Sequence, residues 1–188
     1  MTSRLRRAAA VGATTAVSAS PAPAIDNGVP DGTKHPNAGL LAIEHDGVKD
    51  AWCSGFYAGP HKADPGTGVF VTAARCLADP AAFGFSGSDL TISFDPEVTI
   101  DVDGFTWATA AATRHPGTSR QRGGCSPPAG YGGACYGDSG SPVLRHDSNT
   151  AVALVSGGGD AICRAQNHPL RLDIPAARAF YGDYLQLP

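Results

Sequence analysis

The sequence predicts an all-β protein, and three observations support this fold class. Short apolar segments with β-type alternation recur along the chain between clusters of turn residues. Glycine (24 residues) and proline (15 residues) are frequent, as in a protein with many turns. Charged residues make up only 16% of the chain, against roughly 25% in an average domain. At 188 residues there is room for one domain or two small ones, so we expect a barrel or sandwich of short strands.

The first 24 residues have the features of an export signal. Three arginines, Arg4, Arg6 and Arg7, precede a weakly apolar stretch over residues 8–19, and small residues flank the expected cleavage point. We therefore expect a secreted protein whose mature chain starts at Ile25. The segment contains no acidic residue, so its removal makes the net charge more negative than the −3 of the full chain. A negative chain argues against nucleic acid as a partner.

Strands are expected through most of the remaining chain. The first group covers residues 38–45, 51–57, 69–73, 90–94, 98–102 and 105–109. Asp46-Gly47 predicts a tight turn after the first of these strands, and a polar loop is expected over residues 60–68. The second group covers residues 142–145, 151–156 and 170–172. Pro175 predicts the start of a terminal helix that runs to Gln186, because proline is favoured in a first helical turn.

The segment Cys135–Pro142 carries the main functional signal. It reads Cys-Tyr-Gly-Asp-Ser-Gly-Ser-Pro, and a serine between two glycines needs a permissive backbone that presents a hydroxyl at a loop tip. The octad resembles the nucleophile loop of the chymotrypsin/trypsin-like serine proteases, usually C-x-G-D-S-G-G-P, with Ser141 at the last glycine. The resemblance implies that Ser139 is the nucleophile and that the amides of Gly137 and Ser139 form the oxyanion hole. A glycine-rich surface turn between strands is the alternative reading.

Two further segments resemble the same family. Val71–Cys76 resembles V-T-A-A-H-C, whose histidine is the general base, and Cys53–Gly55 resembles the upstream C-x-G. The resemblance implies a Cys53–Cys76 disulfide. The base position, however, holds Arg75, and a guanidinium stays protonated and has no lone pair with which to accept a proton. The family's orienting aspartate also has no counterpart, because residues 117–124, where the resemblance implies the strand that carries it, contain no acid and no apolar alternation.

The resemblance implies a chymotrypsin-like double β-barrel that is incomplete and ends in a short C-terminal helix. It covers residues 25 to about 115 and about 125 to the end, so the first barrel is expected within 25–116 and the second within 117–188. Incomplete barrels leave open strand edges, which invite pairing with another chain. We therefore expect self-association.

The family pattern implies several further site residues. After signal removal, the ammonium of Ile25 would pair with the buried carboxylate of Asp138. The floor of the specificity pocket would lie near Gly133, so arginine- or lysine-directed cleavage by a pocket aspartate is not expected. The Ser156–Gly158 segment would bind the backbone of a peptide as an added strand, with Gly157 in place of the family's aromatic residue.

The remaining cysteines and histidines complete the expectations. The resemblance implies a second disulfide, Cys135–Cys163, and leaves Cys125 free or able to form an intermolecular bond. His61 and His115 are alternative candidates for a base near the serine, although each is more readily explained as a loop histidine. The spacing of cysteines and histidines does not suit zinc, so no metal and no cofactor is expected. No segment approaches the ~20 apolar residues of a membrane span.

Three functional interpretations stay open at this stage. The first is a secreted serine endopeptidase homologue, hydrolysing peptide bonds through an acyl-enzyme on Ser139, with lost or weak activity because of Arg75 and the missing acid. The second is a non-catalytic module that binds a peptide or protein along Ser156–Gly158. The third is a deletion fragment that does not fold compactly.

Overall fold

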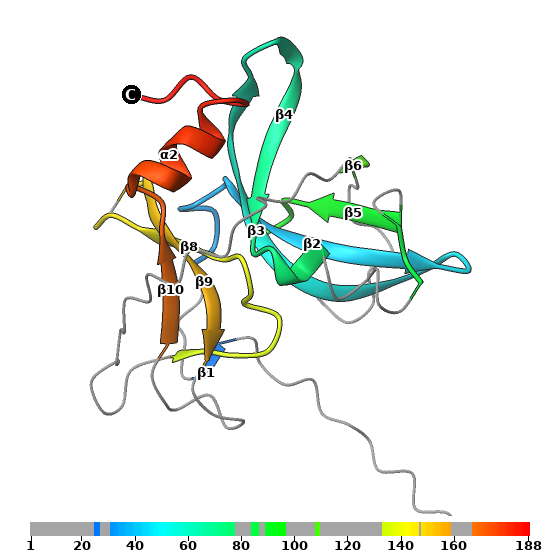
Figure 1. The fold of residues 1–188 in the computed structure, drawn as a ribbon. Coiled ribbons are helices and arrows are strands. Elements are labelled where there is room, and N and C mark those ends of the chain that lie inside the picture. Colours follow the sequence, from blue (N-terminus) through cyan, green and yellow to red (C-terminus); the bar gives the residue numbers. More distant parts are fainter. Residues whose placement is uncertain are drawn as a thin grey trace, which may run out of the picture.

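The computed structural model describes residues 25–26, 31–77, 84–86, 89–96, 108–109, 133–146, 148–158 and 167–188. These residues are mostly strands with a short C-terminal helix (Figure 1), so the expected all-β fold class is confirmed. The strands are β1 (Ile25–Asp26), β2 (Ala38–His45), β3 (Val48–His61), β4 (Asp64–Thr72), β5 (Leu90–Ser93), β6 (Ala108–Thr109), β7 (Gly133–Ala134), β8 (Pro142–Leu144), β9 (Ala151–Gly158) and β10 (Asn167–Arg171); the helix is α2 (Pro175–Tyr181). The signal segment, residues 98–102, His115, Cys125 and Cys163 lie outside the described residues.

The largest sheet has the strand order β4-β3-β2-β5-β6, with every neighbouring pair antiparallel. It curls into a half-barrel (Figure 1). The hairpin between β2 and β3 turns at Asp46-Gly47, where both residues have positive φ angles, 50° and 79°. Two such residues in a two-residue loop match the twist of antiparallel strands, and the predicted turn is confirmed.

The polar loop predicted over residues 60–68 is wrong. Apart from the turn at residues 62–63, these residues belong to β3 and β4, which extend into a long hairpin that projects from the sheet beside the C-terminal segment (Figure 1). Apolar alternation is absent here because this end of the hairpin is exposed on both faces. Pro65 lies at the register irregularity between Pro60 and His61, where a residue without a backbone donor is tolerated.

Helix α2 ends at Tyr181 rather than at the predicted Gln186. At Asp183 and Tyr184 the backbone makes tighter hydrogen bonds to the third residue back, from Asp183 N–H to the Phe180 carbonyl at 3.2 Å and from Tyr184 N–H to the Tyr181 carbonyl at 3.0 Å. Lys62, at the tip of the β3–β4 hairpin, binds two carbonyls of this segment, and the Gly182 carbonyl is one that a helix reaching Gln186 would need. Its side chain donates to the Gly182 carbonyl and its amide donates to the Tyr184 carbonyl at 2.7 Å.

A three-stranded sheet, β10-β9-β8, lies beside the half-barrel, and β1 pairs with β7 as a separate two-stranded ladder. One buried apolar cluster joins the half-barrel to the smaller sheet, because Leu154 of β9 packs in it. Its members are Leu41, Ile43, Cys53, Phe56, Val71, Ala73, Cys76, Leu90, Ile92 and Leu154. Residues 135–141 connect β7 with β8, and they lie where the two sheets meet because they are hydrogen-bonded to Ser54 of β3 and to Val155 of β9. No helix in the described ranges is long and apolar enough to cross a membrane.

Candidate functional site

The loop that carries Ser139 has two residues in the left-handed region of backbone space. Gly137 has φ 93° and Gly140 has φ 92°, a conformation that side chains other than glycine rarely adopt. The Asp138 amide donates to the Cys135 carbonyl at 3.2 Å, and the Ser141 amide donates to the Asp138 carbonyl at 2.9 Å. The glycine positions of the octad are therefore those at which the loop changes direction.

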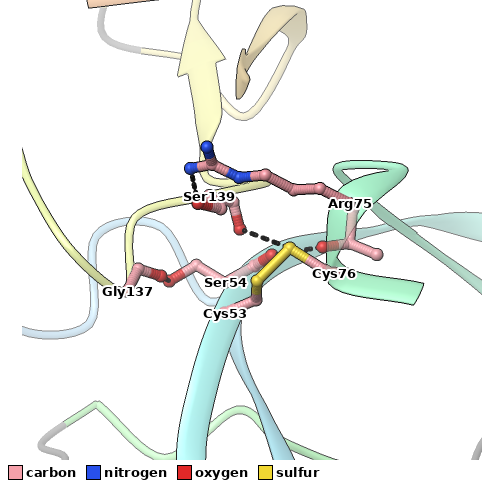
Figure 2. The surroundings of a disulfide bond; sticks show 7 residues. Cys53, Ser54, Arg75, Cys76, Gly137 and Ser139 are labelled. Carbon is pink, nitrogen blue, oxygen red and sulfur yellow. Dashed lines mark hydrogen bonds between the residues drawn. A yellow bond between two sulfur atoms is a disulfide. The ribbon is translucent and has the colours of Figure 1, made fainter. Parts of the chain in front are cut away.

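The Ser139 loop is held between the two sheets by backbone hydrogen bonds. On one side, Ser54 of β3 donates its amide to the Ser139 carbonyl at 2.9 Å and its hydroxyl to the Gly137 carbonyl at 2.9 Å. On the other side, the Gly140 amide donates to the Val155 carbonyl of β9 at 2.7 Å. Both sheets thus fix the position of the serine, and Figure 2 shows Ser54 beside Gly137.

Gly140 is the point of closest approach between the loop and the half-barrel. A Cβ atom at this position would overlap with the Ser54 carbonyl oxygen and the Thr72 hydroxyl oxygen. It would also lie only 2.8 Å from the Ala73 amide nitrogen. The Thr72 hydroxyl also donates to the Ser54 carbonyl at 2.7 Å. Absence of a side chain at residue 140 is therefore a packing requirement as well as a conformational one.

Arg75 reaches across to the serine. It lies at the start of the helical residues 75–77, directly after the turn in which the Cys76 amide donates to the Ala73 carbonyl at 2.9 Å. Its Nη2 donates a hydrogen bond to Ser139 Oγ (Figure 2). Among the described residues, Arg75 is the only side chain hydrogen-bonded to that hydroxyl, and Ser139 itself is only 5% exposed. Arg75, at the position expected for the base, thus contacts Ser139, the expected nucleophile.

The Cys53–Cys76 disulfide is present, which confirms that predicted pairing. It ties β3 to the turn that carries Arg75 and lies next to the Ser139 loop, with Cys76 Sγ 3.5 Å from the Ser139 carbonyl oxygen. A disulfide sulfur has no proton to donate, so we interpret this as a packing contact. Cys135 is also disulfide-bonded; the predicted Cys135–Cys163 pairing falls outside the described residues, because Cys163 does.

Asp138 is a buried carboxyl group without a cationic partner in the described part of the chain. It is 4% exposed, and its Oδ2 accepts the Cys135 amide at 2.7 Å. Burial raises its pKa from 3.8 to about 6, partly offset by that backbone hydrogen bond. Ile25, its expected partner, pairs through its backbone with Ala134 in the β1–β7 ladder, which places the Ile25 backbone close to this loop.

Strand β9 has one partly open edge. On the β8 side its ladder begins with Pro142 opposite Leu154, and Val155 exchanges hydrogen bonds with Gly140 and Ser141. Within the ranges that the structure describes, residues 156–158 have no strand partner on that side. The Arg75 guanidinium borders this edge, because its Nη1 lies 3.8 Å from the place of a Cβ on Gly157.

The other predicted positions are placed as follows. Gly133 lies in β7 opposite Asp26. The amides of Gly137 and Ser139 have no hydrogen-bond acceptor among the described residues. His61 is used at the hairpin tip, where its Nδ1 accepts the amides of Ala63 and Asp64 and its ring packs edge-on against Tyr184.

Sequence reasoning missed the positioning roles of Ser54, Thr72 and Gly140. Ser54 stands in the Cys53–Gly55 motif, so the signal was present, but that motif was used only to predict the disulfide. No group of three metal-ligating side chains occurs within the described ranges.

Comparisons with family models, with curated proteins and with solved structures found no match to this chain.

Proposed function

We propose that this chain is a secreted homologue of the chymotrypsin/trypsin-like serine proteases in which Arg75 leaves the nucleophile without a base. The proposal is supported by the motifs around Cys53, Val71–Cys76 and Ser139, and by the contacts that bring these three segments together. Its substrate or ligand class is a peptide or protein.

The hydrogen bond from Arg75 to Ser139 is the observation that carries the proposal. A base must lie within about 2.6–3.2 Å of the hydroxyl that it deprotonates and must have a lone pair to receive the proton. Arg75 occupies that place as a donor. Its N–H group binds one of the two lone pairs of Ser139 Oγ, and this hydrogen bond draws electron density from the oxygen and makes the hydroxyl a weaker nucleophile.

Residual activity is limited by what the loop retains. The amides of Gly137 and Ser139 are free to bind an oxyanion in the described structure, and an oxyanion hole with substrate binding alone gives about 10³–10⁴-fold acceleration over water. Loss of the serine–base pair costs about 10⁶ in kcat. We therefore expect very slow reaction at Ser139 and no efficient proteolysis.

Covalent labelling with a fluorophosphonate tests this proposal. We expect slow labelling of the wild-type chain that disappears in Ser139→Ala. Arg75→His is expected to speed labelling, because a well-placed base contributes about 10²–10⁴-fold, yet to stay well below that of an active protease because the orienting acid is absent. Arg75→Gln is the matched control, since it removes the guanidinium without adding a base.

Two results would contradict the proposal. Proteolysis by the wild-type chain at a kcat of about 1–10³ s⁻¹, dependent on Ser139, would show that another group serves as the base. Full proteolysis by Arg75→His would show that the missing acid does not matter.

A second candidate function is peptide binding without turnover. The open side of β9 at residues 156–158 favours it, because an extended peptide adds to such an edge through main-chain hydrogen bonds. Saturable binding of a peptide that is recovered intact would support this candidate, and loss of binding when the edge is blocked by Ser156→Pro would locate it.

A further inference from the structure

We infer that Arg75, the Ser139 hydroxyl and the free amides of Gly137 and Ser139 form an anion-binding site that holds the C-terminal carboxylate of a peptide lying along β9. This inference rests on the peptide-binding function proposed above and specifies which end of the peptide is recognised. Arg75, which is proposed to leave the serine without a base, would then serve to bind the ligand.

The first support is the unneutralised charge of Arg75. Cation–carboxylate pairs in the described ranges include His35–Asp31, Lys49–Glu44 and Arg171–Asp173. Within the same ranges, the only side-chain hydrogen-bond partner of Arg75 is the neutral hydroxyl of Ser139. A guanidinium has five N–H donors in a planar fork that matches the two oxygens of a carboxylate. Arg75 therefore has donors left for a ligand.

The second support is the set of donors on the other side of the site. Ser139 Oγ accepts from Arg75 through a lone pair, so its own proton remains available for donation. The amides of Gly137 and Ser139 have no acceptor in the part of the chain that the structure describes. The Asp138 amide between them is already bonded to the Cys135 carbonyl, so these two amides are the backbone donors that the turn at Gly137, with φ 93°, leaves for an anion.

The position of the guanidinium indicates a peptide rather than an isolated anion. It lies between the buried Ser139 hydroxyl and Gly157 of β9, so one cation borders both the donor cluster and the open strand edge. Gly157 leaves the space that a larger side chain would fill. A peptide paired with residues 156–158 would thus end beside Arg75.

Asp138 is the acidic residue next to the proposed site, and its carboxylate would repel a bound anion. Its carboxyl group is buried, it forms no ion pair with Arg75, and its Oδ2 is turned to the Cys135 amide. A ligand carboxylate would therefore face the donors of Arg75, Gly137 and Ser139 and not the Asp138 oxygen that is already bonded.

Binding by the full chain to a set of N-acetylated tetrapeptides with different last residues tests the inference. Each peptide is compared with its C-terminal amide, and sodium acetate is the free carboxylate. We expect at least one acid to bind about tenfold or more tightly than its amide, as charge-assisted hydrogen bonds are roughly twice as strong as neutral ones. Acetate should bind far more weakly than that acid.

Arg75→Gln should abolish the preference for the acid over the amide, and Arg145→Gln, which removes the same charge from an exposed position beyond β8, should leave it unchanged. Near-UV circular dichroism of both variants verifies that they are folded.

Equal binding of acid and amide by the wild-type chain would overturn the inferred carboxylate site while leaving the proposed peptide-binding edge of β9 intact. If acetate bound as tightly as the peptide, the site would recognise a carboxylate and not a peptide. If no probe bound, both the carboxylate site and peptide binding along β9 would be overturned. Fluorophosphonate labelling, which does not depend on peptide affinity, would still report on the impaired protease.

Discussion

The two sides of the Ser139–Arg75 contact are positioned equally well but differ in what their chemistry permits. The Ser139 loop has left-handed glycines, backbone hydrogen bonds to both sheets and a serine at the position proposed for the nucleophile. The Arg75 turn has its disulfide and its regular backbone hydrogen bonds, yet it presents a donor in place of an acceptor. The contacts that set the positions of these two segments, which are backbone hydrogen bonds, the Ser54 hydroxyl and the disulfide, do not involve the guanidinium. The scaffold can therefore be intact while the proposed reaction lacks its base.

The largest expected effect on stability comes from adding a side chain at Gly140, where the Ser139 loop lies closest to the half-barrel. In Gly140→Ala, the added Cβ would meet backbone of Ser54 and Ala73 and the Thr72 hydroxyl, at a φ of 92°. We expect a loss of about 3 kcal/mol or more in the free energy of unfolding, since overpacking and backbone strain add. Urea unfolding measures it.

Gly157→Ala is the matched control for that substitution. Its Cβ would have the Arg75 guanidinium as its nearest neighbour, at an ordinary contact distance of 3.8 Å, so the expected change is within about 0.5 kcal/mol. Similar losses in the two variants would show that the loop does not depend on close approach to the half-barrel.

The next effect concerns the Arg75 side of the contact. Replacing both Cys53 and Cys76 by serine releases a crosslink between residues 23 apart in sequence, which should cost about 3 kcal/mol. Because the bond is adjacent to Arg75, the variant should also lose part of the contact with Ser139 and label faster with a fluorophosphonate than the wild-type chain. Thermal unfolding with and without reductant measures the first effect; an unchanged melting temperature would contradict it.

The sequence predicted the strands and the disulfide better than it predicted the extent of the elements. Alternation and turn residues located β2, β5 and the Asp46-Gly47 turn, because these depend on neighbours in the chain. The ends of β4 and α2 depend on each other instead: Lys62 binds carbonyls of the segment after the helix. No local pattern reports a contact across that distance in sequence.

The same distinction applies to the site. The octad showed that Ser139 needs glycines on both sides, since a left-handed backbone is a local property. It did not show that Gly140 must lack a side chain because of Ser54 and Thr72. Nor did it show that Arg75 would bind the serine, which depends on how two segments meet.

The smallest expected effect on stability comes from the charge of Asp138 in the Ser139 loop, and it depends on pH. Burial raises the pKa of Asp138 to about 6 from 3.8, so between these values the folded chain holds more protons than the unfolded chain. The contribution of Asp138 to stability is then most favourable below about pH 4, falls as pH rises through about 6, and stays low above it. The difference is at most about 3 kcal/mol.

Asp138→Asn should remove this dependence and raise stability at pH 7, because the amide oxygen can still accept the Cys135 N–H while no charge is buried. Urea unfolding of both full-length chains at pH 4, 5, 6 and 7 measures the difference, and parallel pH profiles would contradict an unpaired buried carboxylate. The same pair of chains starting at Ile25 tests the predicted activation pair. There a free ammonium is available, so an ion pair with Asp138 would reverse the sign and make Asp138→Asn the less stable chain at pH 7. If the sign does not reverse, Ile25 pairs with Ala134 through its backbone without supplying a counter-charge, and the loop keeps its glycine geometry without that ion pair.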